Sequence, residues 1–443
     1  MRSRFRMSRR VVVLTAVAAL STGLLAGCAE DSDEPGSASP GGGDGKGRTT
    51  VTVGVFGVFG YKQAGLYDAY EKLNPGVTVK ETSIERVDQY YPNLLTHLGT
   101  GSGLQDIQAV EVGNITEVAA KHSDKFVDLG ETTGVDKESF VPWKWAQATA
   151  ENGKTVGLGT DIGPMAICYR KDLFRQAGLP TDRKEVGKLW AGDWRKYIDT
   201  GRDYMAKAPK GTVFLDSAGG VYNAAVSGNV ERYYDKSGKI IYKDSPAVKE
   251  AWGLAMDAID GKMTAKLKQF DKTWDQAYAN GRFATVSCPP WMLGYIKEKA
   301  GEKAADRWDV APAPKPANWG GSFLAVPEAA KNKDEAVKLA AWLTAPEQQA
   351  KLFEKQASFP SSRAAYELPE VAGARHEYFD HAPIGKIFAD AARGIPTLVV
   401  GEKDLTIQTA ITDVGVLQVE QQGRTPGQGW AAAVKNIDNA LDQ

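Results

Sequence analysis

The sequence predicts an α/β protein with more than one domain. Apolar and polar residues alternate over 50–57, a helical pattern follows over 67–73, and alternation returns over 77–84. Two strands joined through a helix imply a right-handed crossover and a parallel sheet. The length of 443 residues corresponds to roughly two to three domains. Glycine- and proline-containing stretches interrupt the regular patterns at 159–164, 311–316 and 359–362.

The first 28 residues predict an export signal rather than part of the fold. Arginines within residues 1–10 precede an apolar run at 11–20, which is too short for a typical membrane-spanning helix. The run leads to LAGC at 25–28, which resembles the bacterial lipobox and implies cleavage before Cys28 and lipidation of its sulfur. A plain secretory signal with a coincidental cysteine is the alternative, and Arg9 with Arg10 also suggests twin-arginine export. Residues 29–48 are rich in Gly, Ser, Pro and Asp and predict a flexible tether.

The charge of the chain argues against a nucleic-acid partner. The full chain has a formal net charge of −1, and removal of the signal leaves 49 basic against 55 acidic residues, a net charge of −6. There is no basic surplus to neutralise phosphates. No later stretch is long and apolar enough to span a bilayer. We therefore expect membrane contact only through the lipid on Cys28.

The first part of the chain directs polar and aromatic side chains to one edge of the predicted sheet. Phe59 lies in the glycine-containing loop after the strand at 50–57. A helix is expected over 88–98 and a third strand over 107–112, with Glu111 and Asn114 at its carboxyl end. In open α/β sheets this edge is where ligands bind.

The pattern changes after the first break. From 180 to 309 it is mostly helical, and the alanine–proline run at 311–316 predicts an extended strap between lobes. Helices are also expected at 171–177, at 333–343 and over most of the residues after 362. The remaining expected strands lie at 152–160 (a strand or hairpin), 166–169, 213–215, 283–287 and 322–326.

Trp291 lies directly after one of these strands. Pro289 and Pro290 cannot donate to a sheet ladder, so the strand at 283–287 must end before them. The rigid turn delivers a wide aromatic face that suits the flat apolar face of a sugar ring. The alternative is that Trp291 only covers a core.

Several motifs, taken together, resemble the extracellular solute-binding proteins of bacterial sugar ABC transporters, the group that includes maltose-binding protein. Besides the lipobox, they are YRKDLF at 169–174, AGLP at 177–180, NGRFA at 280–284, PW at 290–291, WGGSF at 319–323, VP at 326–327, AWLTAPEQQ at 341–349 and FP at 359–360. Within the group, CPPWM at 288–292 and NWGG at 318–321 look most like actinobacterial cellobiose and cello-oligosaccharide binders.

The resemblance implies a two-lobed periplasmic-binding-protein fold of type II, in which each lobe is a mainly parallel sheet flanked by helices and the ligand binds in the cleft between lobes. It assigns residues 49–159 and 319–357 to the N-terminal lobe, and residues 164–315 and 358–443 to the C-terminal lobe. The implied protein is a monomer, lipid-anchored on the extracellular face of the cytoplasmic membrane, that captures an oligosaccharide by lobe closure and delivers it to the permease subunits of an ABC importer. No cofactor or metal is implied.

The resemblance also implies a set of ligand-binding residues. Carboxylates and amides fit such a site because each can bridge two neighbouring ring hydroxyls, although each acid could instead be a solvated surface group or a helix cap. Phe56 or Tyr61 could take the place of Phe59. The implied residues are Phe59, Glu111, Asn114, Asp161, Asp216, Tyr222, Trp291 and Trp319.

Other classes of protein fit the sequence less well. Glu111 and Asp161 could be imagined as the acid and base of a secreted glycoside hydrolase, which is the alternative function. The sequence contains no Gly-x-Ser-x-Gly elbow, Walker loop or His-Glu-x-x-His motif, its four histidines lack metal-ligand spacing, and no repeat suggests an adhesin.

Cys168 and Cys288 remain after lipidation of Cys28. They form either a disulfide, which an oxidising compartment allows, or two buried thiols.

Overall fold

The computed structural model describes residues 48–442. The predicted signal, the predicted lipidation site Cys28 and nearly all of the tether lie outside this range. Across the described range, no helix is both long and apolar enough to cross a membrane.

The first sheet has five strands in the order β2-β1-β3-β9-β4. These are β1 (Thr49–Phe56), β2 (Val77–Ile84), β3 (Ile107–Glu111), β4 (Leu158–Gly159) and β9 (Ser322–Ala325). β1 pairs in parallel with β2 and β3, whereas β9 is antiparallel to both β3 and β4. Four strands therefore run in one direction and β9 alone is reversed.

The second sheet has four strands in the order β6-β7-β5-β8. These are β5 (Ala166–Arg170), β6 (Val213–Leu215), β7 (Phe283–Cys288) and β8 (Trp308–Pro312). β6 and β7 are parallel, and β5 is antiparallel to β7 and β8. Here β5 alone is reversed.

The reversed strands correct the expectation of mainly parallel sheets to one of mixed sheets. β5 and β9 are the first strands that the chain enters after passing from one sheet to the other. Such a strand starts at the end of its sheet that lies next to the other sheet, which we call the shared edge. It must therefore run away from this edge, while the other strands run toward it. Trp291 and Asn114 follow strands of the second kind, β7 and β3, so both lie at the shared edge.

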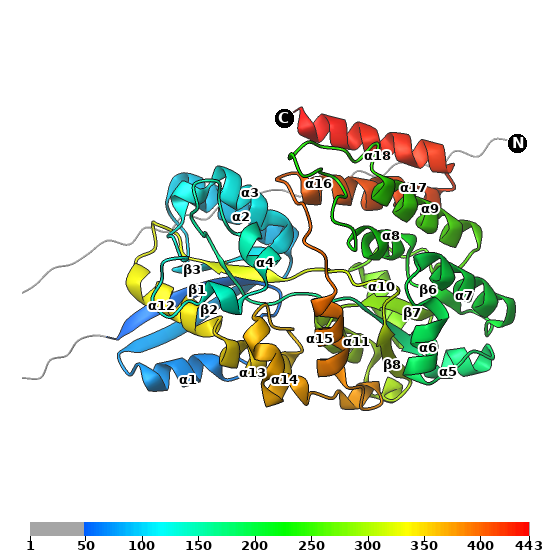
Figure 1. Cartoon of the computed structure of the whole chain (residues 1–443), viewed down its shortest axis with the longest axis horizontal. Helices are drawn as coiled ribbons and strands as arrows, with labels where there is room; N and C mark the ends of the chain where they lie inside the picture. Colours follow the sequence, from blue (N-terminus) through cyan, green and yellow to red (C-terminus); the bar gives the residue numbers. More distant parts are fainter. Residues whose placement is uncertain (1–47, 443) are drawn as a thin grey trace, which may run out of the picture. The chain divides into compact units, whose positions relative to one another are not determined.

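Helices cover both faces of each sheet (Figure 1). Every residue of β5 and β7 is buried, as expected for strands covered on two sides. The α-helices are α1 (Leu66–Leu73), α2 (Val87–Thr100), α3 (Val112–Lys121), α4 (Pro142–Gln147), α5 (Lys171–Gln176), α6 (Arg183–Trp190), α7 (Trp194–Lys207), α8 (Ala218–Val226), α9 (Pro246–Asp260), α10 (Lys272–Ala279), α11 (Trp291–Ala300), α12 (Lys333–Leu343), α13 (Pro346–Gln356), α14 (Pro369–Ala372), α15 (Ile384–Arg393), α16 (Asp404–Thr409), α17 (Leu417–Gln422) and α18 (Pro426–Leu441). Short 3₁₀ helices occur at η1 (Ser123–Lys125), η2 (Lys137–Ser139), η3 (Glu302–Ala304), η4 (Arg363–Glu367) and η5 (Glu377–Phe379), and η6 (Ala410–Val416) is a π-helix.

Each sheet has its own apolar core. Helices α1 and α12 pack with β1 on one face of the first sheet, and α2 and α3 pack with β9 on the other. Around the second sheet, α7, α8 and α9 share one cluster, while α10, α11 and α15 share another. Helix α13 contributes Leu352 to a first-sheet cluster and Phe353 to a second-sheet cluster.

The segments that pass between the sheets lie side by side. The amide of Ile162 donates to the carbonyl of Phe359 at 2.8 Å, and the amide of Trp319 donates to the carbonyl of Gly163 at 2.8 Å. A side chain on Gly163 would collide with the Trp319 carbonyl, which explains the glycine. The predicted breaks at 159–164 and 359–362 thus lie side by side. The passage that follows β8 contacts the first break through residues 317–319, after the predicted break at 311–316, because β8 continues to Pro312. The exact lobe boundaries stay a prediction.

Two features of the second sheet were not settled by the sequence. Strand β8 occupies part of the range that was expected to be a strap or helical, because the run of prolines masks a buried strand before Pro312. Cys168 and Cys288 are joined by a disulfide that links β5 to β7, with the Cα atoms 5.4 Å apart.

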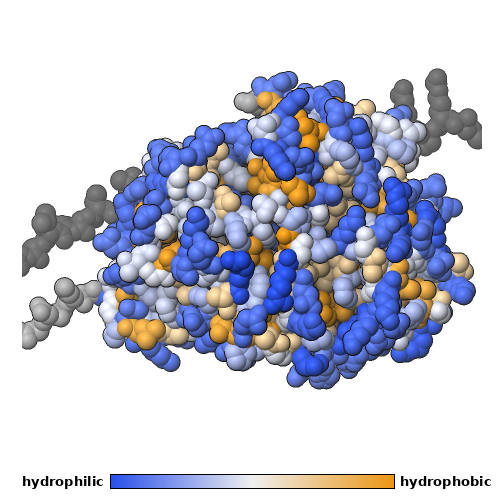
Figure 2. Space-filling model, viewed as in Figure 1, coloured by the Kyte–Doolittle hydropathy of each residue, from blue (hydrophilic) through white to orange (hydrophobic). Residues whose placement is uncertain are grey.

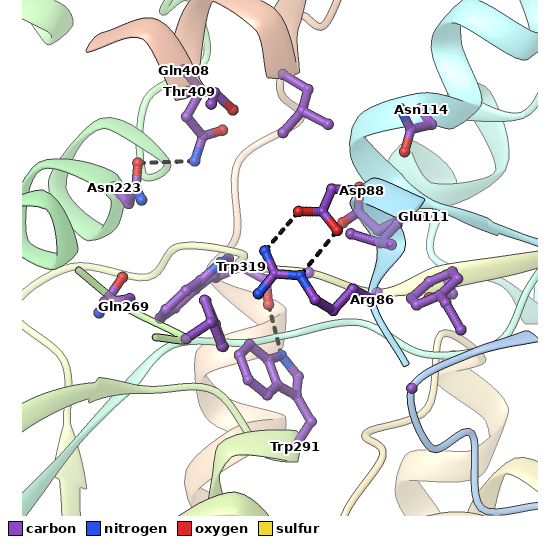
Figure 3. Close-up of a pocket in the computed structure, with 18 of the residues that line it drawn as sticks. Arg86, Asp88, Glu111, Asn114, Asn223, Gln269, Trp291, Trp319, Gln408 and Thr409 are labelled. Atoms are coloured by element: carbon purple, nitrogen blue, oxygen red, sulfur yellow. Dashed lines mark hydrogen bonds and ion pairs between the residues drawn. The ribbon is translucent and has the colours of Figure 1, made fainter. Parts of the chain in front are cut away.

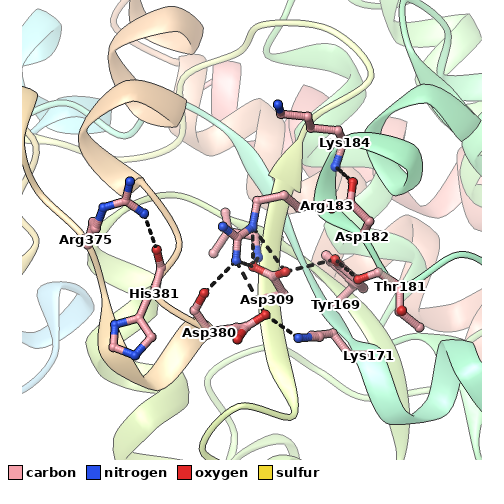
Figure 4. A network of polar contacts seen from close by, with 11 residues as sticks. Tyr169, Lys171, Thr181, Asp182, Arg183, Lys184, Asp309, Arg375, Asp380 and His381 are labelled. Atoms are coloured by element: carbon pink, nitrogen blue, oxygen red, sulfur yellow. Dashed lines mark hydrogen bonds and ion pairs between the residues drawn. The ribbon is translucent and has the colours of Figure 1, made fainter.

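A polar network holds the opposite end of the second sheet (Figure 4). Arg183 forms an ion pair with the buried Asp309 at 2.9 Å and donates to the carbonyl of Asp380 at 2.7 Å. Tyr169 also donates to Asp309, at 3.1 Å, and Lys171 pairs with the Asp380 carboxylate. The network ties the segment around Asp380 to β5 and β8. It borders a small cavity of about 330 Å³.

Candidate ligand-binding site

A cavity of about 780 Å³ opens at the edge shared by the two sheets (Figure 3). Its walls come from the loops after β1, β2 and β3, from the passages between the sheets, and from α8, α11 and the α16–α17 region. The residues that line it include six of the eight predicted ligand-binding residues: Phe59, Glu111, Asn114, Asp161, Trp291 and Trp319.

One corner of the cavity is aromatic. Trp291 is the first residue of α11, and its indole N–H donates to the Trp319 carbonyl oxygen at 3.1 Å. The two indole rings lie 5.3 Å apart and nearly perpendicular. Phe270 lies 6.2 Å from Trp291 and 6.1 Å from Trp319. We call Phe270, Trp291 and Trp319 the aromatic corner.

Two predicted carboxylates lie on the first-sheet side, near a buried lysine. Glu111 accepts from the Gly113 amide as the N-cap of α3, and Asp161 accepts from the Ser322 amide at 2.9 Å. Burial raises the pKa of both carboxyls, that of Glu111 to about 7. Lys144 is fully buried 3.7 Å from the Phe323 ring centre, and burial lowers its pKa to about 8 while both carboxylates oppose that shift. Glu111 is thus a helix cap that also lines the cavity.

The end of β1 and the loop after it supply more than one aromatic side chain. Phe56, Phe59 and Tyr61 all line the cavity, so the structure does not single out Phe59. Phe56 and Phe59 pack edge to face at 5.2 Å, and Tyr61 is fully buried. Asn114, in the first turn of α3, lines the cavity on the same side (Figure 3).

Two predicted residues do not line the cavity. Asp216 follows β6 as expected, but its buried carboxylate accepts from Gln269 and from the indole of Trp274, each at 2.8 Å. Tyr222 is fully buried within α8 and donates to the hydroxyl of Tyr233 at 3.2 Å. Asp216 therefore supports residues near the cavity, because Gln269 lines it, and Tyr222 belongs to the core.

Sequence reasoning missed an ion pair in the first-sheet wall. Arg86 and Asp88, after β2, are 2.6 Å apart and extend into the cavity (Figure 3). Hydrogen bonding from Arg86 lowers the pKa of the Asp88 carboxyl. The rule that ligands gather at the carboxyl ends of strands applies to β2 as well, so this pair could have been found.

The wall from the C-terminal region was also missed. Asn223 of α8 accepts from Gln408 of α16 at 2.9 Å, beside the π-helix η6 (Figure 3). π-Helical turns are rare and often occur at functional sites. The lining residues of this region are Leu405, Gln408, Thr409, Thr412, Asp413, Val416, Leu417 and Glu420. No sequence motif marks them, since they lie on helices that are close to the cavity only in the folded chain.

Within residues 48–442, no cluster of His, Cys, Asp or Glu side chains has the arrangement of a metal site. The polar side chains of the cavity come instead from amides, carboxylates and hydroxyls spread over both walls. Such groups donate to and accept from a polyhydroxylated ligand.

Comparison with known proteins identifies the family. Residues 65–377 match the profile of bacterial extracellular solute-binding proteins. A lactose-binding protein of Rhizobium radiobacter is 25% identical over 364 residues, covering 78% of this chain and 82% of that protein. The sn-glycerol-3-phosphate-binding periplasmic protein of Escherichia coli O1:K1 / APEC is 23% identical over 344 residues, covering 72% of this chain and 75% of that protein.

A solved structure supports the same assignment. The crystal structure of an extracellular solute-binding protein family 1 member is 40% identical and covers 88% of this chain and 99% of that chain, with a TM-score of 0.79. The fold is the two-lobed periplasmic-binding-protein fold expected from the sequence, with mixed sheets. This chain belongs to the family of bacterial extracellular solute-binding proteins.

Proposed function

We propose that this protein is the substrate-binding component of an ABC importer and captures a neutral oligosaccharide in the 780 Å³ cavity. The observation that carries the proposal is the aromatic corner, which shares the cavity with carboxylates and the Asn114 amide of the first-sheet side and with amides of the second-sheet side. Aromatic faces bind the C–H face of a sugar ring, and the polar groups bind its hydroxyls.

The charge of the cavity supports a neutral ligand over an anionic one. Among residues 48–442, its lining contains six carboxylates but only two basic residues, Arg86 and Lys268. Each basic residue is already paired, Arg86 with Asp88 at 2.6 Å and Lys268 with Asp413 at 3.0 Å. A phosphate group in this cavity would meet no basic side chain among the described lining residues that is free of a carboxylate partner, so its negative charge would be poorly compensated and the free energy of binding would rise. We therefore favour the ligand class of the lactose-binding relative over that of the glycerol-phosphate-binding relative.

Cellobiose and cello-oligosaccharides are the first candidate ligands. The reason is the resemblance of the segments at 288–292 and 318–321 to those of cellobiose binders, and these segments contain Trp291 and Trp319. We expect the sugar to be enclosed as the lobes close about the passages between the sheets, a hinge motion of a known kind.

We also propose that the protein is anchored to the cytoplasmic membrane by a lipid. The LAGC sequence at 25–28 supports lipidation of Cys28 and a position on the extracellular face of the cytoplasmic membrane. There the protein would deliver its sugar, as a monomer, to the permease subunits.

A thermal-shift screen tests the ligand class, because a ligand that binds only the folded state raises the melting temperature. The panel should contain cellobiose, cellotriose, lactose, maltose and sn-glycerol 3-phosphate. We expect at least one saccharide to raise the melting temperature and sn-glycerol 3-phosphate to have no effect. A shift with sn-glycerol 3-phosphate alone would contradict the proposal.

Incubation of the purified protein with cello-oligosaccharides tests the alternative function of a glycoside hydrolase. The two relatives named above are binding proteins, and we expect cello-oligosaccharides to remain intact after a day of incubation. Hydrolysis that persists through repurification and disappears in Glu111→Gln or Asp161→Asn would overturn the binding function in favour of an enzyme.

A further inference from the structure

Phe270 is the most exposed aromatic residue of the cavity wall. It retains 44% of its accessible surface, whereas Trp291, Trp319 and Phe59 are more deeply buried. The other large apolar side chains with comparable exposure in the described range, Val58, Leu73 and Val230, are aliphatic. The face of the molecule that Figure 2 shows is mostly hydrophilic, with apolar residues in small patches. Phe270 is therefore unusual among the described residues, because it is a half-exposed aromatic side chain and lies beside two tryptophans.

The backbone at Phe270 has an uncommon conformation. Its φ angle is +67°, in the left-handed region that bulky residues rarely adopt. Such strain persists only where the surroundings impose it, and it concentrates at functional sites. The residues just before Phe270 in the loop are held in place by contacts with other parts of the chain. Gln269 donates to Asp216 at 2.8 Å, Lys268 pairs with Asp413 at 3.0 Å, and the Lys266 carbonyl accepts from Gln421 at 2.9 Å.

Aromatic rings surround Phe270 on its buried side. Its ring lies 5.1 Å from that of Trp274 and 6.2 Å from that of Tyr295. The Phe270 and Trp291 rings are nearly parallel, with an angle of 30° between their planes. Trp291 is itself held in place, because its indole N–H is bonded to the Trp319 carbonyl (Figure 3). The exposed part of Phe270 thus extends a rigid aromatic surface into the cavity.

From this arrangement we propose that Phe270 directly stacks against a pyranose ring of the ligand, beside Trp291, and so helps to select sugars with a continuous C–H face. The proposal rests on the proposed function of oligosaccharide binding. The face of the phenyl ring carries partial negative charge, which attracts the axial C–H bonds of a flat hexopyranose. A sugar ring whose axial hydroxyl interrupts that face would lose part of this contact.

A substitution series at Phe270 tests the proposal by separating the flat ring from apolar volume. Binding of cellobiose and of lactose is measured by titration calorimetry for wild type, Phe270→Tyr, Phe270→Leu and Phe270→Gly, each first checked for cooperative thermal unfolding. We expect Phe270→Tyr to bind within about three-fold of wild type, and Phe270→Leu and Phe270→Gly to bind roughly ten- to thirty-fold more weakly. The control is Lys262→Gly, which changes an exposed residue with φ +52° in the same connection between α9 and α10 and should bind like wild type.

Each result has a defined meaning. Phe270→Leu with wild-type affinity would overturn the proposal, because it would show that only apolar volume is needed. Tighter or faster binding by Phe270→Gly would also overturn it, since Phe270 would then be a gate over Trp291. If Phe270→Gly does not fold, the comparison of Phe270→Leu with Phe270→Tyr still decides. If wild type binds no saccharide, the proposed function itself fails; if wild type binds and all variants bind equally, only the role of Phe270 fails.

Discussion

The indole N–H of Trp291 donates to the carbonyl oxygen of Trp319 at 3.1 Å, and this bond joins a helix of the second sheet to a passage between the two sheets. Trp291 follows β7, and Trp319 lies in the passage between β8 and β9. The bond fixes both the side chain of a proposed sugar-binding residue and the backbone of a passage about which the lobes are expected to move. Gly320 fits the same arrangement, because a Cβ there would lie 3.0 Å from the Trp291 nitrogen.

Replacement of Trp291 by alanine should weaken saccharide binding more than it destabilises the protein. An aromatic residue at the centre of an interface contributes about 2–4 kcal/mol, which corresponds to a roughly thirty-fold to several-hundred-fold loss of affinity. The unfolding free energy of the sugar-free protein should fall by less than the roughly 3–5 kcal/mol of a core deletion. Calorimetry and denaturant unfolding give the two numbers.

Trp430 offers a matched control for Trp291. It is also partly exposed, but it lies in α18 and packs against Trp252 rather than lining the cavity. Trp430→Ala should change stability and leave affinity unaltered. Wild-type affinity together with a much lower melting temperature in Trp291→Ala would mean that Trp291 is a core residue.

The disulfide between Cys168 and Cys288 should be detectable as the absence of free thiols. The protein lacking residues 1–28 should show none under denaturing, non-reducing conditions. The bond closes a sequence separation of 120 residues, and its removal by Cys168→Ala with Cys288→Ala should cost about 2–4 kcal/mol of unfolding free energy. Two reactive thiols in the unreduced protein would contradict the bond.

Glu111 should make the folded protein less stable as pH rises through the weakly acidic range. Its pKa is raised from 4.5 to about 7, chiefly by burial. Between these values the folded state holds a proton that the unfolded state has released, so stability decreases with increasing pH. The variant Glu111→Gln keeps an oxygen that can accept from Gly113 and should flatten this part of the profile. Denaturant unfolding between pH 4.5 and 7 measures it, and a profile as steep in Glu111→Gln as in wild type would exclude the effect.

Lipidation of Cys28 predicts a difference between wild type and Cys28→Ala. Metabolic labelling with a fatty acid should mark only the wild-type protein. The variant should be released into the medium or remain unprocessed. Equal labelling of both proteins would refute the lipid anchor on Cys28.

The sequence predicted the fold where local patterns agreed with tertiary structure. Strand ends could be read from alternation and from breaking residues such as Pro289, so the place of Trp291 was predictable. The reversal of β5 and β9 could not be read from the sequence, because strand direction depends on which sheet the chain has just left. Strand β8 was obscured by the proline at its end.

The candidate site was predictable only in part for a related reason. Reasoning from strand ends finds the correct loop but not the direction of each side chain, and Asp216 turns toward Gln269 and Trp274 instead of the cavity. Phe270 lies in a loop without a motif. Gln408 and its neighbours are brought to the cavity by helix packing alone, which leaves no local signal in the sequence.

Competition calorimetry shows whether the cavity binds a neutral saccharide. Protein lacking residues 1–28 is titrated with the saccharide that gives the largest thermal shift, in the absence and in the presence of a large excess of sn-glycerol 3-phosphate. We expect one saccharide to bind per chain, and we expect this binding to be unaffected by the competitor and greatly weakened in Trp291→Ala. Displacement of the saccharide by sn-glycerol 3-phosphate, or binding that is undiminished in Trp291→Ala, would contradict this expectation.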